Sequence, residues 1–593
     1  MGKRAGRDLE QVAAAAAHYK AGRMDQALAT ARKVLSRNPT QPAANQIAAT
    51  VLARKNMIDQ SLYHAERAAK GAPDDAVMQA SLGQILIAAG RFEDSLEALD
   101  RAVALDQSLA STHIARGTAL QQLHRYEDAI AALGRGLELD ADALDGWVNL
   151  ATAQLELARA DQAVETLREA VRRAPDNAAV WTLLCNALNY PSGVPAAEVY
   201  AAHVRYGAIV EKGLRDREVA FANKPEPEKV LRVGYLSRDM RTHSCAYFLL
   251  SILRGHDSSR VESYCYSHSR HVDAMTDEIR EAATVFRDCS TMGDGELRKR
   301  IASDRVDILV ELAGHSALHK LPMLAHRVAP IQATYLGYPH TTGLKNIDYR
   351  IVDGRTDPEE APAHATEELA RLPKCFICYS PPSDAPEPSA LPSSGGAVFT
   401  FGSFNEAKKI SHEVVGLWSQ VLERVPEARL LLKAGSFEDK AVRAGVLERF
   451  VAEGIEANRI EIVARTPTQA EHLAYYGKVD LALDTYPYHG TTTTCEAAWM
   501  GVPTVSLRGD RHAARVGASL LHVVGLGELV ADTHDQFVEI AAAMAGDRAK
   551  LAEIRAGLRE RMRSSALCDR DGFTRDLEAV YRQWWQRWCE AQN

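Results

Sequence analysis

Long apolar runs are missing from this 593-residue sequence, and no stretch approaches the roughly 20 consecutive apolar residues of a membrane-spanning helix. A signal core is missing as well, because the basic start Met1–Asp8 leads directly into the mixed segment Glu10–Lys20. The nine cysteines are odd in number and scattered from Cys185 to Cys589, which argues against a secreted disulfide framework. Together these absences predict a cytoplasmic protein.

A surplus of positive charge is also missing. The 70 lysines and arginines are outnumbered by 78 aspartates and glutamates, and the formal net charge is −8. The chain therefore has no overall positive field for a phosphate backbone, and we expect no nucleic-acid partner. The composition, 46% hydrophobic and 25% charged, is typical of several folded domains with large cores and excludes a disordered or fibrous protein.

The first third of the chain repeats itself every 34 residues. Three columns follow this period: Met24, Ile58, Phe92, Tyr126 and Ala160; Ala27, Ser61, Ser95, Ala129 and Ala163; Leu28, Leu62, Leu96, Ile130 and Val164. Apolar residues recur at i, i+3 and i+4 on both sides of polar turns, which indicates two short helices per unit. The pattern resembles the tetratricopeptide repeat and predicts about five repeats over residues 1–190, a superhelix that binds proteins.

Beyond the repeats the period changes to short β-branched runs that alternate with helical segments, which predicts parallel sheets of the α/β class. We expect a helical junction at 191–229, a first α/β lobe at 230–380, a proline- and serine-rich linker at 381–396, a second α/β lobe at 397–570 and a C-terminal helix at 571–593. The expected strands are residues 231–237, 261–266, 306–312, 331–336, 398–404, 430–433, 460–464, 481–484 and 503–507. A cleft between the carboxyl ends of two such sheets is where ligands usually bind. The tryptophan-bearing end of the C-terminal helix is expected to pack back on the lobes.

One stretch in the second lobe, Asp484–Pro503, has the composition of an anion site. A strand ends at Asp484, Gly490 permits a tight turn, and four threonines precede a helix that begins near Cys495. Free N–H groups, the positive end of the helix dipole and several hydroxyls would converge on a pyrophosphate at Thr491, Thr492, Thr493 and Thr494 without any metal. Glu496 could accept hydrogen bonds from both ribose hydroxyls. The alternative is a helix cap that only stabilises the helix.

Five ordered motifs carry a resemblance that covers nearly the whole chain. They are Arg232–Asp239 with His243 after it, Ala329–Gly343, Asp348–Asp353, Phe404–Ile410 and the threonine stretch. With the repeats, they resemble the family of O-GlcNAc transferases and Spindly-type O-fucosyltransferases. The resemblance implies a repeat superhelix followed by a GT-B-type glycosyltransferase of two Rossmann-like lobes. It also implies metal-independent transfer of a sugar, with inversion, to serine or threonine hydroxyls of proteins.

The resemblance also assigns roles to residues of the second lobe. Lys409 matches the lysine that contacts the donor phosphates, where its charge would offset the negative charge on the departing diphosphate. Lys433, at the end of a strand, is a second phosphate candidate. Asn405 and Glu406 belong to the same donor-binding motif as Lys409, and His472 matches a histidine that stacks near the base.

In the first lobe the resemblance assigns residues to the sugar and the acceptor. His243 matches a histidine that faces both, as a catalytic base or an acceptor-positioning group. The loop with Gly337, Pro339, His340 and Thr341 matches one that approaches the donor sugar, where glycine permits close backbone contact. No metal or other cofactor is expected.

Two departures keep the nucleotide open. Where animal-type enzymes of the family read uracil with a lysine, this sequence has Gln469, and Glu496 replaces their aspartate. We favour transfer of N-acetylglucosamine from UDP-GlcNAc to protein hydroxyls. The alternatives are fucosyl transfer from GDP-fucose and a repeat scaffold with an inactive enzyme fold. Acceptor proteins or peptides are expected to bind along the repeats.

Overall fold

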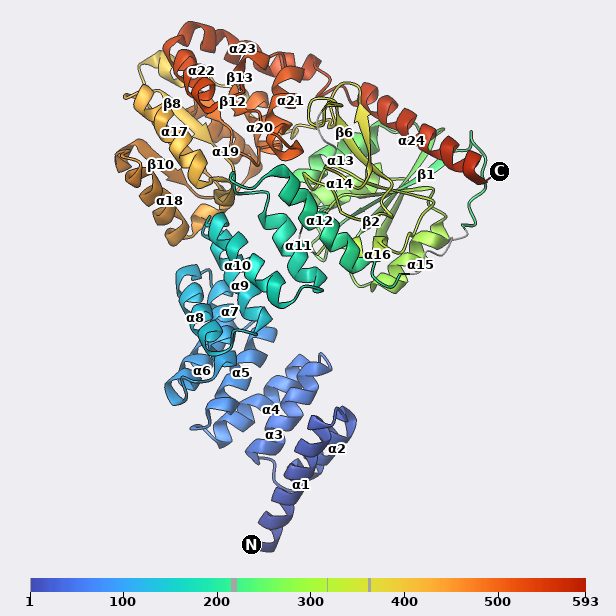
Figure 1. Cartoon of the computed structure of the whole chain (residues 1–593), viewed down its shortest axis with the longest axis vertical. Coiled ribbons are helices and arrows are strands. Elements are labelled where there is room, and N and C mark those ends of the chain that lie inside the picture. The colour runs from blue at the N-terminus through green and yellow to red at the C-terminus, as the bar shows by residue number, and fades with distance from the viewer. Residues whose placement is uncertain (1, 215–220, 317, 361–363, 593) are drawn as a thin grey trace. The chain divides into compact units, whose positions relative to one another are not determined.

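The computed structural model describes residues 2–214, 221–316, 318–360 and 364–592 (Figure 1). They form two compact units, the first of Met1–Leu157 with Gln162–Pro175 and the second of Ala158–Asp161 with Asp176–Asn593. Within the described ranges, no helix has the length and apolar character needed to cross a lipid bilayer.

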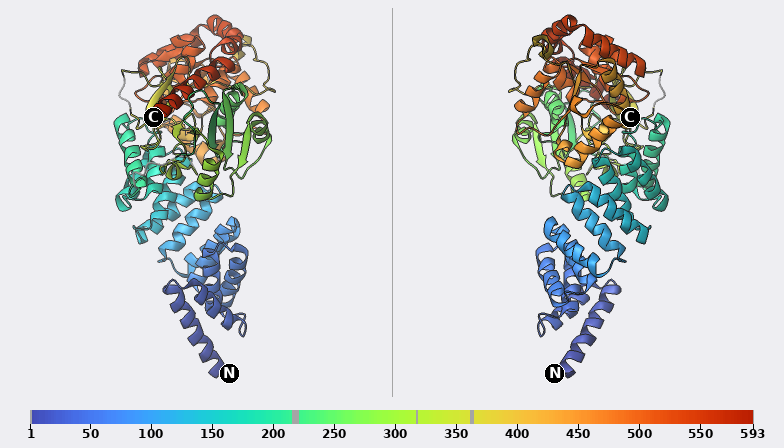
Figure 2. Two further views of the ribbon diagram at one scale, coloured as in Figure 1. Left: turned by 90° about the vertical axis from the view of Figure 1, so that its right-hand side faces the viewer. Right: turned by 90° about the vertical axis from the view of Figure 1, so that its left-hand side faces the viewer.

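The repeat unit consists of antiparallel helix pairs that follow one another along the chain (Figure 2). Their cores use small side chains, such as Ala27, Ala31 and Ala65, which are fully buried and let neighbouring helices approach closely. The described part of this unit contains five pairs, as the 34-residue period predicts: α1 (Gly2–Lys20) and α2 (Met24–Leu35), α3 (Pro42–Arg54) and α4 (Ile58–Gly71), α5 (Ala76–Ala88) and α6 (Phe92–Leu105), α7 (Ala110–Gln122) and α8 (Tyr126–Leu139), α9 (Leu144–Glu156) and α10 (Ala160–Arg173).

The turn inside each pair has the same backbone geometry in every repeat. A residue with positive φ recurs every 34 positions, at Gly22, Asn56, Gly90, His124 and Ala158, with φ between 57° and 74°. Only two of the five are glycines, although the left-handed region costs other residues about 1 kcal/mol or more. The repeats therefore impose the turn even where the local sequence disfavours it.

The helical junction belongs to the second unit and not to the repeats. Helices α11 (Ala178–Ala187) and α12 (Ala196–Val210) follow the repeat pattern, but they pack on the first lobe. The Tyr338 hydroxyl bonds with Asn189 Nδ2 at 2.9 Å and with His203 Nε2 at 2.8 Å. The same hydroxyl donates to the Cys185 carbonyl of α11 at 2.9 Å, so the first compact unit ends at Pro175, while the predicted repeat boundary at 190 stays a prediction.

The first lobe is built on a parallel sheet whose described strands have the order β3-β2-β1-β4-β5-β6-β7. Its strands are β1 (Leu231–Ser237), β2 (Val261–Ser267), β3 (Val285–Asp288), β4 (Ile308–Glu311), β5 (Ile331–Thr334), β6 (Tyr349–Asp353) and β7 (Glu368–Leu372). The connecting helices are α13 (Ser244–Gly255), α14 (Ala274–Ala282), α15 (Asp294–Asp304) and α16 (Leu321–Leu324).

The second lobe has a parallel sheet of order β10-β9-β8-β11-β12-β13 in the described residues. A short 3-10 turn, η1 (Pro392–Gly395), leads from the linker into it. The strands are β8 (Thr400–Ser403), β9 (Arg429–Lys433), β10 (Ile460–Val463), β11 (Leu481–Leu483), β12 (Thr504–Leu507) and β13 (Val530–Ala531). The helices are α17 (His412–Arg424), α18 (Lys440–Ala452), α19 (Gln469–Ala474), α20 (Thr492–Trp499), α21 (Val516–Val523), α22 (His534–Gly546) and α23 (Arg548–Ser564), with 3-10 turns η2 (Ala407–Lys409), η3 (Gly435–Glu438), η4 (Ala457–Arg459), η5 (Tyr475–Lys478), η6 (His512–Ala514) and η7 (Gly527–Leu529).

The last helix, α24 (Arg570–Gln592), returns from the second lobe to the first (Figures 1 and 2). The Trp584 ring stacks on Tyr349 of β6 with centroids 4.1 Å apart, and the Tyr581 hydroxyl lies 3.3 Å from that of Tyr235 on β1. The tryptophans therefore pack on a lobe, as the sequence predicted.

In both sheets the strand order reverses next to the first strand. The reversal lies between β1 and β4 in the first lobe and between β8 and β11 in the second. Doubly wound sheets bind ligands at the carboxyl ends of the strands beside this point. Two Rossmann-like lobes after helical repeats are the fold that the sequence predicted.

Candidate functional site

The loop after β11 folds back on the carboxylate of Asp484. One oxygen, Oδ1, accepts the N–H groups of Thr485 at 2.9 Å and Gly490 at 2.8 Å. The other accepts the Ser506 hydroxyl at 2.8 Å. A Cβ at Gly490 would lie 2.2 Å from the Thr493 hydroxyl oxygen, so only glycine fits here. This turn delivers the chain into α20.

The threonines at the start of α20 make hydrogen bonds other than a helix cap. Thr491 occupies the N-cap position, yet its side chain makes no cap hydrogen bond. The Thr493 hydroxyl instead donates to Asn405 Oδ1 at 3.2 Å, and the Thr494 hydroxyl donates to the Gly490 carbonyl at 2.9 Å. Because the first N–H groups of a helix have no partner within it, this end of α20 offers donors to an anion. Thr492 also lies in this first turn.

Asn405 ties this helix end to the reversal point of the sheet. It follows β8 directly and is 5% exposed. Next to it, the Phe404 ring packs on Tyr476 with centroids 4.1 Å apart, and the Tyr476 hydroxyl donates to the Thr493 carbonyl at 3.1 Å. The sequence analysis missed Tyr476, because nothing in the helical pair Tyr475 and Tyr476 distinguishes it from a core residue. Glu406, the next residue after Asn405, is exposed.

Four predicted or flanking residues form one polar chain beside the helix. Lys433 Nζ lies 2.7 Å from His472 Nδ1, and His472 Nε2 lies 3.2 Å from Glu496 Oε2. Gln469 Nε2 donates to the other carboxylate oxygen, Oε1, at 3.0 Å. Since a lysine ammonium can only donate, Nδ1 of His472 accepts and Nε2 carries the proton that points to Glu496. The contacts bring Lys433, His472 and Glu496 together, and their predicted role in donor binding stays a prediction.

Burial sets the charge properties of this chain. The side chain of Lys433 is 2% exposed, and burial lowers the pKa of its ammonium group, while the charge of Glu496 opposes that shift. Glu496 is 5% exposed. A buried carboxylate flanked by hydrogen-bond donors is suited to bind the hydroxyls of a ligand.

Lys409 stands on the other side of the glycine turn. Its Nζ donates to the carbonyl of His489 at 2.8 Å and lies 4.1 Å from the centroid of the Tyr488 ring. Burial lowers the pKa of Lys409 to about 8, with a smaller contribution from Lys408 and an opposing one from Asp484. A half-buried cation therefore lies beside the segment that leads into the N-terminus of α20.

His243 caps a helix of the first lobe. Its Nδ1 accepts the N–H of Cys245 at 3.3 Å at the start of α13. Burial lowers its pKa, and the arginines Arg241 and Arg238 act in the same direction against Asp239. The ring is thus neutral near pH 7, and its proton is on Nε2, which lies 4.0 Å from Asp239 Oδ1. In this geometry His243 is a hydrogen-bond donor.

The start of α13 faces the second lobe. Tyr488, whose ring contacts Lys409, also packs against Tyr190 with centroids 5.4 Å apart. Burial raises the pKa of Tyr247 on α13 to about 12, and the charge of Glu496 adds to the shift. Tyr247 of the first lobe therefore lies close enough to Glu496 of α20 for its pKa to respond to that charge.

The loop of the first lobe that was predicted to approach the sugar contacts two different helices, α13 through Gly337 and α12 through His340. A Cβ at Gly337 would lie 1.7 Å from the Leu312 carbonyl and 3.4 Å from Cys245 Sγ, so this glycine approaches the start of α13 closely. Pro339 is buried. His340 stacks on His203 of α12 with centroids 4.5 Å apart, and the Thr341 hydroxyl bonds with Glu367. The side chains of His340 and Thr341 are thus engaged with α12 and with Glu367, and the predicted approach of this loop to the sugar stays a prediction.

A metal-binding arrangement is absent from the vicinity of α20 in the part of the chain that the structure describes. The cluster with suitable spacing, Cys185, His203 and His315, is buried where α11 and α12 meet the first lobe. Both ring nitrogens of His203 already have hydrogen-bond partners, at the Val199 carbonyl and the Tyr338 hydroxyl. The absence of a metal from the reaction stays a prediction.

Comparison with known proteins supports the architecture. The profile of glycosyl transferase family 41 matches residues 210–380 and 390–577, and tetratricopeptide repeat profiles match residues 48–110 and 120–185. A Petunia hybrida protein named "Probable UDP-N-acetylglucosamine--peptide N-acetylglucosaminyltransferase SPINDLY" is 40% identical over 409 residues. That alignment covers 68% of this chain and 44% of the Petunia protein, so the chain matches less than half the length of this relative.

Two further proteins extend the comparison. A Caenorhabditis elegans UDP-N-acetylglucosamine–peptide N-acetylglucosaminyltransferase is 25% identical over 475 residues, which cover 60% of this chain and 41% of that protein. The solved structure of a Thermobaculum terrenum O-GlcNAc transferase variant superposes with a TM-score of 0.79 at 31% identity, over 87% of this chain and 98% of the other. With its profile matched over more than half of its length, the chain belongs to glycosyltransferase family 41.

Proposed function

We propose that the chain transfers N-acetylglucosamine from UDP-GlcNAc to serine and threonine hydroxyls of proteins, with inversion at the anomeric carbon and without a metal ion. The observation that carries the proposal is the convergence of Lys409 and the α20 N-terminus on one glycine turn. Both present positive charge to the same space, as a departing diphosphate requires. The printed names of the Petunia and nematode relatives specify the same donor and a peptide acceptor.

In this reaction the acceptor oxygen forms a bond to the anomeric carbon while the bond from that carbon to the diphosphate oxygen breaks. The leaving diphosphate takes the electron pair and becomes more negative, and the proton of the acceptor hydroxyl passes to water. Lys409 and the first N–H groups of α20 stabilise this charge, which is greater in the transition state than in the bound donor. Glu496 accepts hydrogen bonds from the ribose hydroxyls in place of its present bonds with Gln469 and His472.

His243 positions the acceptor in this proposal. Because its Nδ1 accepts the Cys245 N–H, the proton on Nε2 is available for donation to the acceptor or to the sugar. To act as the general base, the ring would first have to give up this bond and shift its proton to Nδ1. The geometry thus favours positioning over proton abstraction, and the repeats hold the rest of the acceptor chain.

A second candidate is fucosyl transfer from GDP-fucose. It rests on Gln469, which stands where animal-type enzymes have a uracil-reading lysine and which donates to Glu496. An amide can both donate and accept hydrogen bonds, so it can pair with either base.

The test is calorimetric titration of the full chain with UDP and with GDP, followed by transfer from UDP-GlcNAc and GDP-fucose to serine- and threonine-containing peptides, read by mass spectrometry. We expect tighter binding of UDP, transfer of N-acetylglucosamine, and the same rate in EDTA. Tighter binding of GDP with fucosyl transfer would establish the second candidate. Nucleotide binding without any transfer would make the chain a scaffold, and loss of transfer in EDTA would refute the metal-free mechanism.

A further inference from the structure

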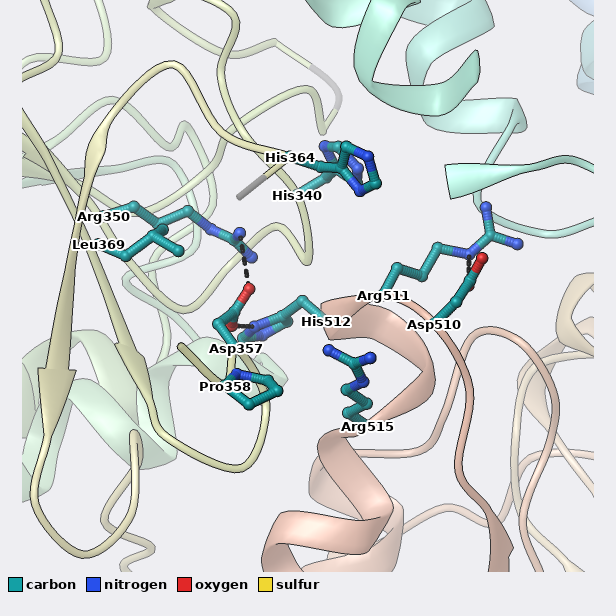
Figure 3. Close-up of a pocket in the computed structure, with 10 residues that line it drawn as sticks. All are labelled: His340, Arg350, Asp357, Pro358, His364, Leu369, Asp510, Arg511, His512 and Arg515. Atoms are coloured by element: carbon teal, nitrogen blue, oxygen red, sulfur yellow. Dashed lines mark hydrogen bonds and ion pairs between the residues drawn. The ribbon is translucent and has the colours of Figure 1, made fainter. Parts of the chain in front are cut away.

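A second polar pocket lies between the two lobes, apart from the residues assigned to the donor (Figure 3). It contains about 370 Å³ of empty space, part of it open to solvent. The first lobe supplies Arg350 on β6 and residues that flank β7, and the second lobe supplies the segment between β12 and α21. We call it the arginine pocket; its lining residues are His340, Arg350, Asp357, Pro358, His364, Leu369, Asp510, Arg511, His512 and Arg515.

Two guanidinium groups in the arginine pocket are buried without enough acceptors. Arg350 and Arg511 are each 4% exposed. Among the described residues, Nη2 of Arg350 and both Nε and Nη1 of Arg511 have no hydrogen-bond partner. A buried donor without a partner destabilises a protein, and more so when the group is charged. The folded chain therefore maintains cationic donors that an oxyanion would satisfy.

The charges of the pocket leave a positive excess. Its three arginines face two aspartates, and Asp510 is largely exposed, with a side-chain exposure of 61%. Asp357 is already engaged, because His512 Nδ1 lies 2.6 Å from its Oδ2 and Arg350 Nη1 lies 3.7 Å from its Oδ1 (Figure 3). Burial disfavours the charged form of Asp357, but His512 and Arg350 outweigh it and hold its pKa well below the ordinary value. Asp510 pairs with Arg511, whose Nε lies 3.7 Å from its Oδ1 (Figure 3), so both carboxylates are engaged and three arginines facing two aspartates leave one positive charge in excess.

The arginine pocket is next to the donor residues but does not include them. Its segment from the second lobe runs behind His489, whose N–H donates to the Ala513 carbonyl at 3.1 Å and whose Nδ1 accepts the Gly517 N–H at 3.0 Å. Lys409 bonds with His489 at its carbonyl oxygen. The donor residues Lys433, His472 and Glu496 are absent from the pocket lining.

We propose that the arginine pocket binds a small phosphate-type oxyanion, held by Arg350 from the first lobe and by Arg511 and Arg515 from the second. Guanidinium groups match the geometry of such anions and bind them with two parallel hydrogen bonds. Bound there, the anion contacts both lobes and stabilises their closed arrangement. The ligand is inorganic phosphate or a small phosphomonoester, since both present the same terminal oxygens.

The test is calorimetry and thermal unfolding of the full chain in a phosphate-free buffer, with inorganic phosphate and O-phosphoserine as separate probes. The variants Arg511→Met and Arg515→Met keep the apolar stem and remove the cation. Arg508→Met is the matched control, because Arg508 lies at the end of β12 outside the pocket and pairs with Asp532. UDP titrations of each variant measure the donor site separately.

We expect phosphate to stabilise the wild type and the control, and each pocket variant to bind it about tenfold to a hundredfold more weakly with unchanged UDP affinity. Without phosphate, Arg511→Met should melt about 2–4 °C higher than the wild type, because it removes a buried cation with two donor atoms, Nε and Nη1, that have no hydrogen-bond partner. A merely structural arginine would lower the melting temperature instead. Binding of O-phosphoserine with the same dependence on arginine would identify a phosphomonoester site, and binding of phosphate alone would identify free phosphate.

The proposal fails if 20 mM phosphate, roughly the upper end of a weak specific affinity, neither binds nor stabilises the wild type. It also fails if both pocket variants retain the wild-type response, or if saturating UDP abolishes phosphate binding, which would place the anion in the donor site. Failure in any of these ways leaves the proposed transferase reaction intact, since that reaction depends on UDP binding and transfer.

Discussion

The two lobes have sheets of the same local order, yet they use the carboxyl ends of their strands differently. In the second lobe, Lys433 at the end of β9 and Glu496 on α20 form a polar chain through His472. In the first lobe, Glu311 at the end of β4 accepts N–H groups from Ala313 at 3.1 Å and Gly314 at 2.6 Å, and the Thr334 hydroxyl at 3.0 Å.

Both glutamates are buried, but only one has side-chain partners that a ligand can replace. Glu496 bonds with the side chains of Gln469 and His472, which can rotate away. Glu311 bonds mainly with backbone N–H groups, which cannot. The same edge of one fold thus serves as a binding site in one lobe and as a loop anchor in the other, according to whether the partners are side chains or main chain.

Removal of the Lys409 cation should have the largest effect. Lys409→Met keeps the stem and loses the charge, so turnover should fall by about 10²–10³ while UDP affinity falls less, because the charge acts mostly on the departing diphosphate. Steady-state kinetics with separate calorimetry measure the two effects. Lys408→Met, a change at the neighbouring position, should keep most of the activity, and full turnover by Lys409→Met would refute the assigned role.

The two glutamates give a direct test of the difference between the lobes. Glu496→Ala should weaken UDP binding by up to about a hundredfold, equivalent to ~1–3 kcal/mol, with little change in melting temperature. Thr493→Ala should act in the same direction, because it removes a hydroxyl at the α20 terminus. Glu311→Ala should destabilise the protein by about 2–4 kcal/mol and leave the UDP affinity of the folded fraction unchanged, because it deprives main-chain N–H groups of their acceptor. Calorimetry measures UDP affinity, and thermal unfolding measures stability. If either substitution changed UDP affinity and stability to the same extent, the two glutamates would not differ in role as argued here.

The pH dependence should report Lys409. Because burial lowers its pKa from 10.5 to about 8, kcat/KM should fall about tenfold per pH unit above pH 8, as the cation is lost in the free enzyme. Stability responds with the opposite sign: the unfolded chain retains the proton up to a higher pH, so the cost of burying this cation is present below pH 8 and diminishes above it. Lys409→Met should lack this limb of the pH–rate profile.

Two glycines of the repeat unit differ in backbone geometry, and their substitution should give the smallest changes in stability predicted here. Gly90 has φ of 73°, whereas Gly134 lies within α8, and an added Cβ would meet no atom within 4 Å at either glycine. Gly90→Ala should therefore destabilise the repeats by about 0.5–1 kcal/mol, and Gly134→Ala should stabilise them by about as much. Chemical denaturation followed by circular dichroism measures the change in unfolding free energy of each variant. If both changes had the same sign, packing and not φ would determine the effect of the substitutions.

Periodicity was enough to predict most of the fold. The strand at Leu231–Ser237 was predicted with its observed ends, and the strand predicted at 306–312 shortens to β4. β3, β6, β7 and β13 were missed, since two to five residues carry too little alternation to identify a strand. The predicted end of the repeats at 190 stays a prediction, because α11 continues the helical period and also contacts Tyr338 of the first lobe, which cannot be read from local sequence.

For the candidate site, too, the sequence identified residues but not the tertiary contacts that they make. Lys433, His472 and Glu496 were predicted as donor residues one by one, and the structure shows that they contact one another; their donor role stays a prediction. The partners that set their chemistry could not be predicted, because Gln469 on Glu496 and Cys245 on His243 depend on tertiary geometry. His340 was predicted in the loop that approaches the sugar, which stays a prediction; its stacking on His203 of α12 and its place in the arginine pocket could not be predicted.

The return of α24 to the first lobe sets the timing of folding during synthesis. Tyr235 on β1 and the Glu226 carbonyl bond with Tyr581 and Trp585, which lie about 350 residues later in the chain. At ~5–20 residues per second, the ribosome needs roughly 20–70 s to make the intervening chain. Throughout that time α24 cannot pack on this face of the first lobe, so the face stays exposed and chaperones can bind it. The lobe is complete only after the last helix has left the ribosome.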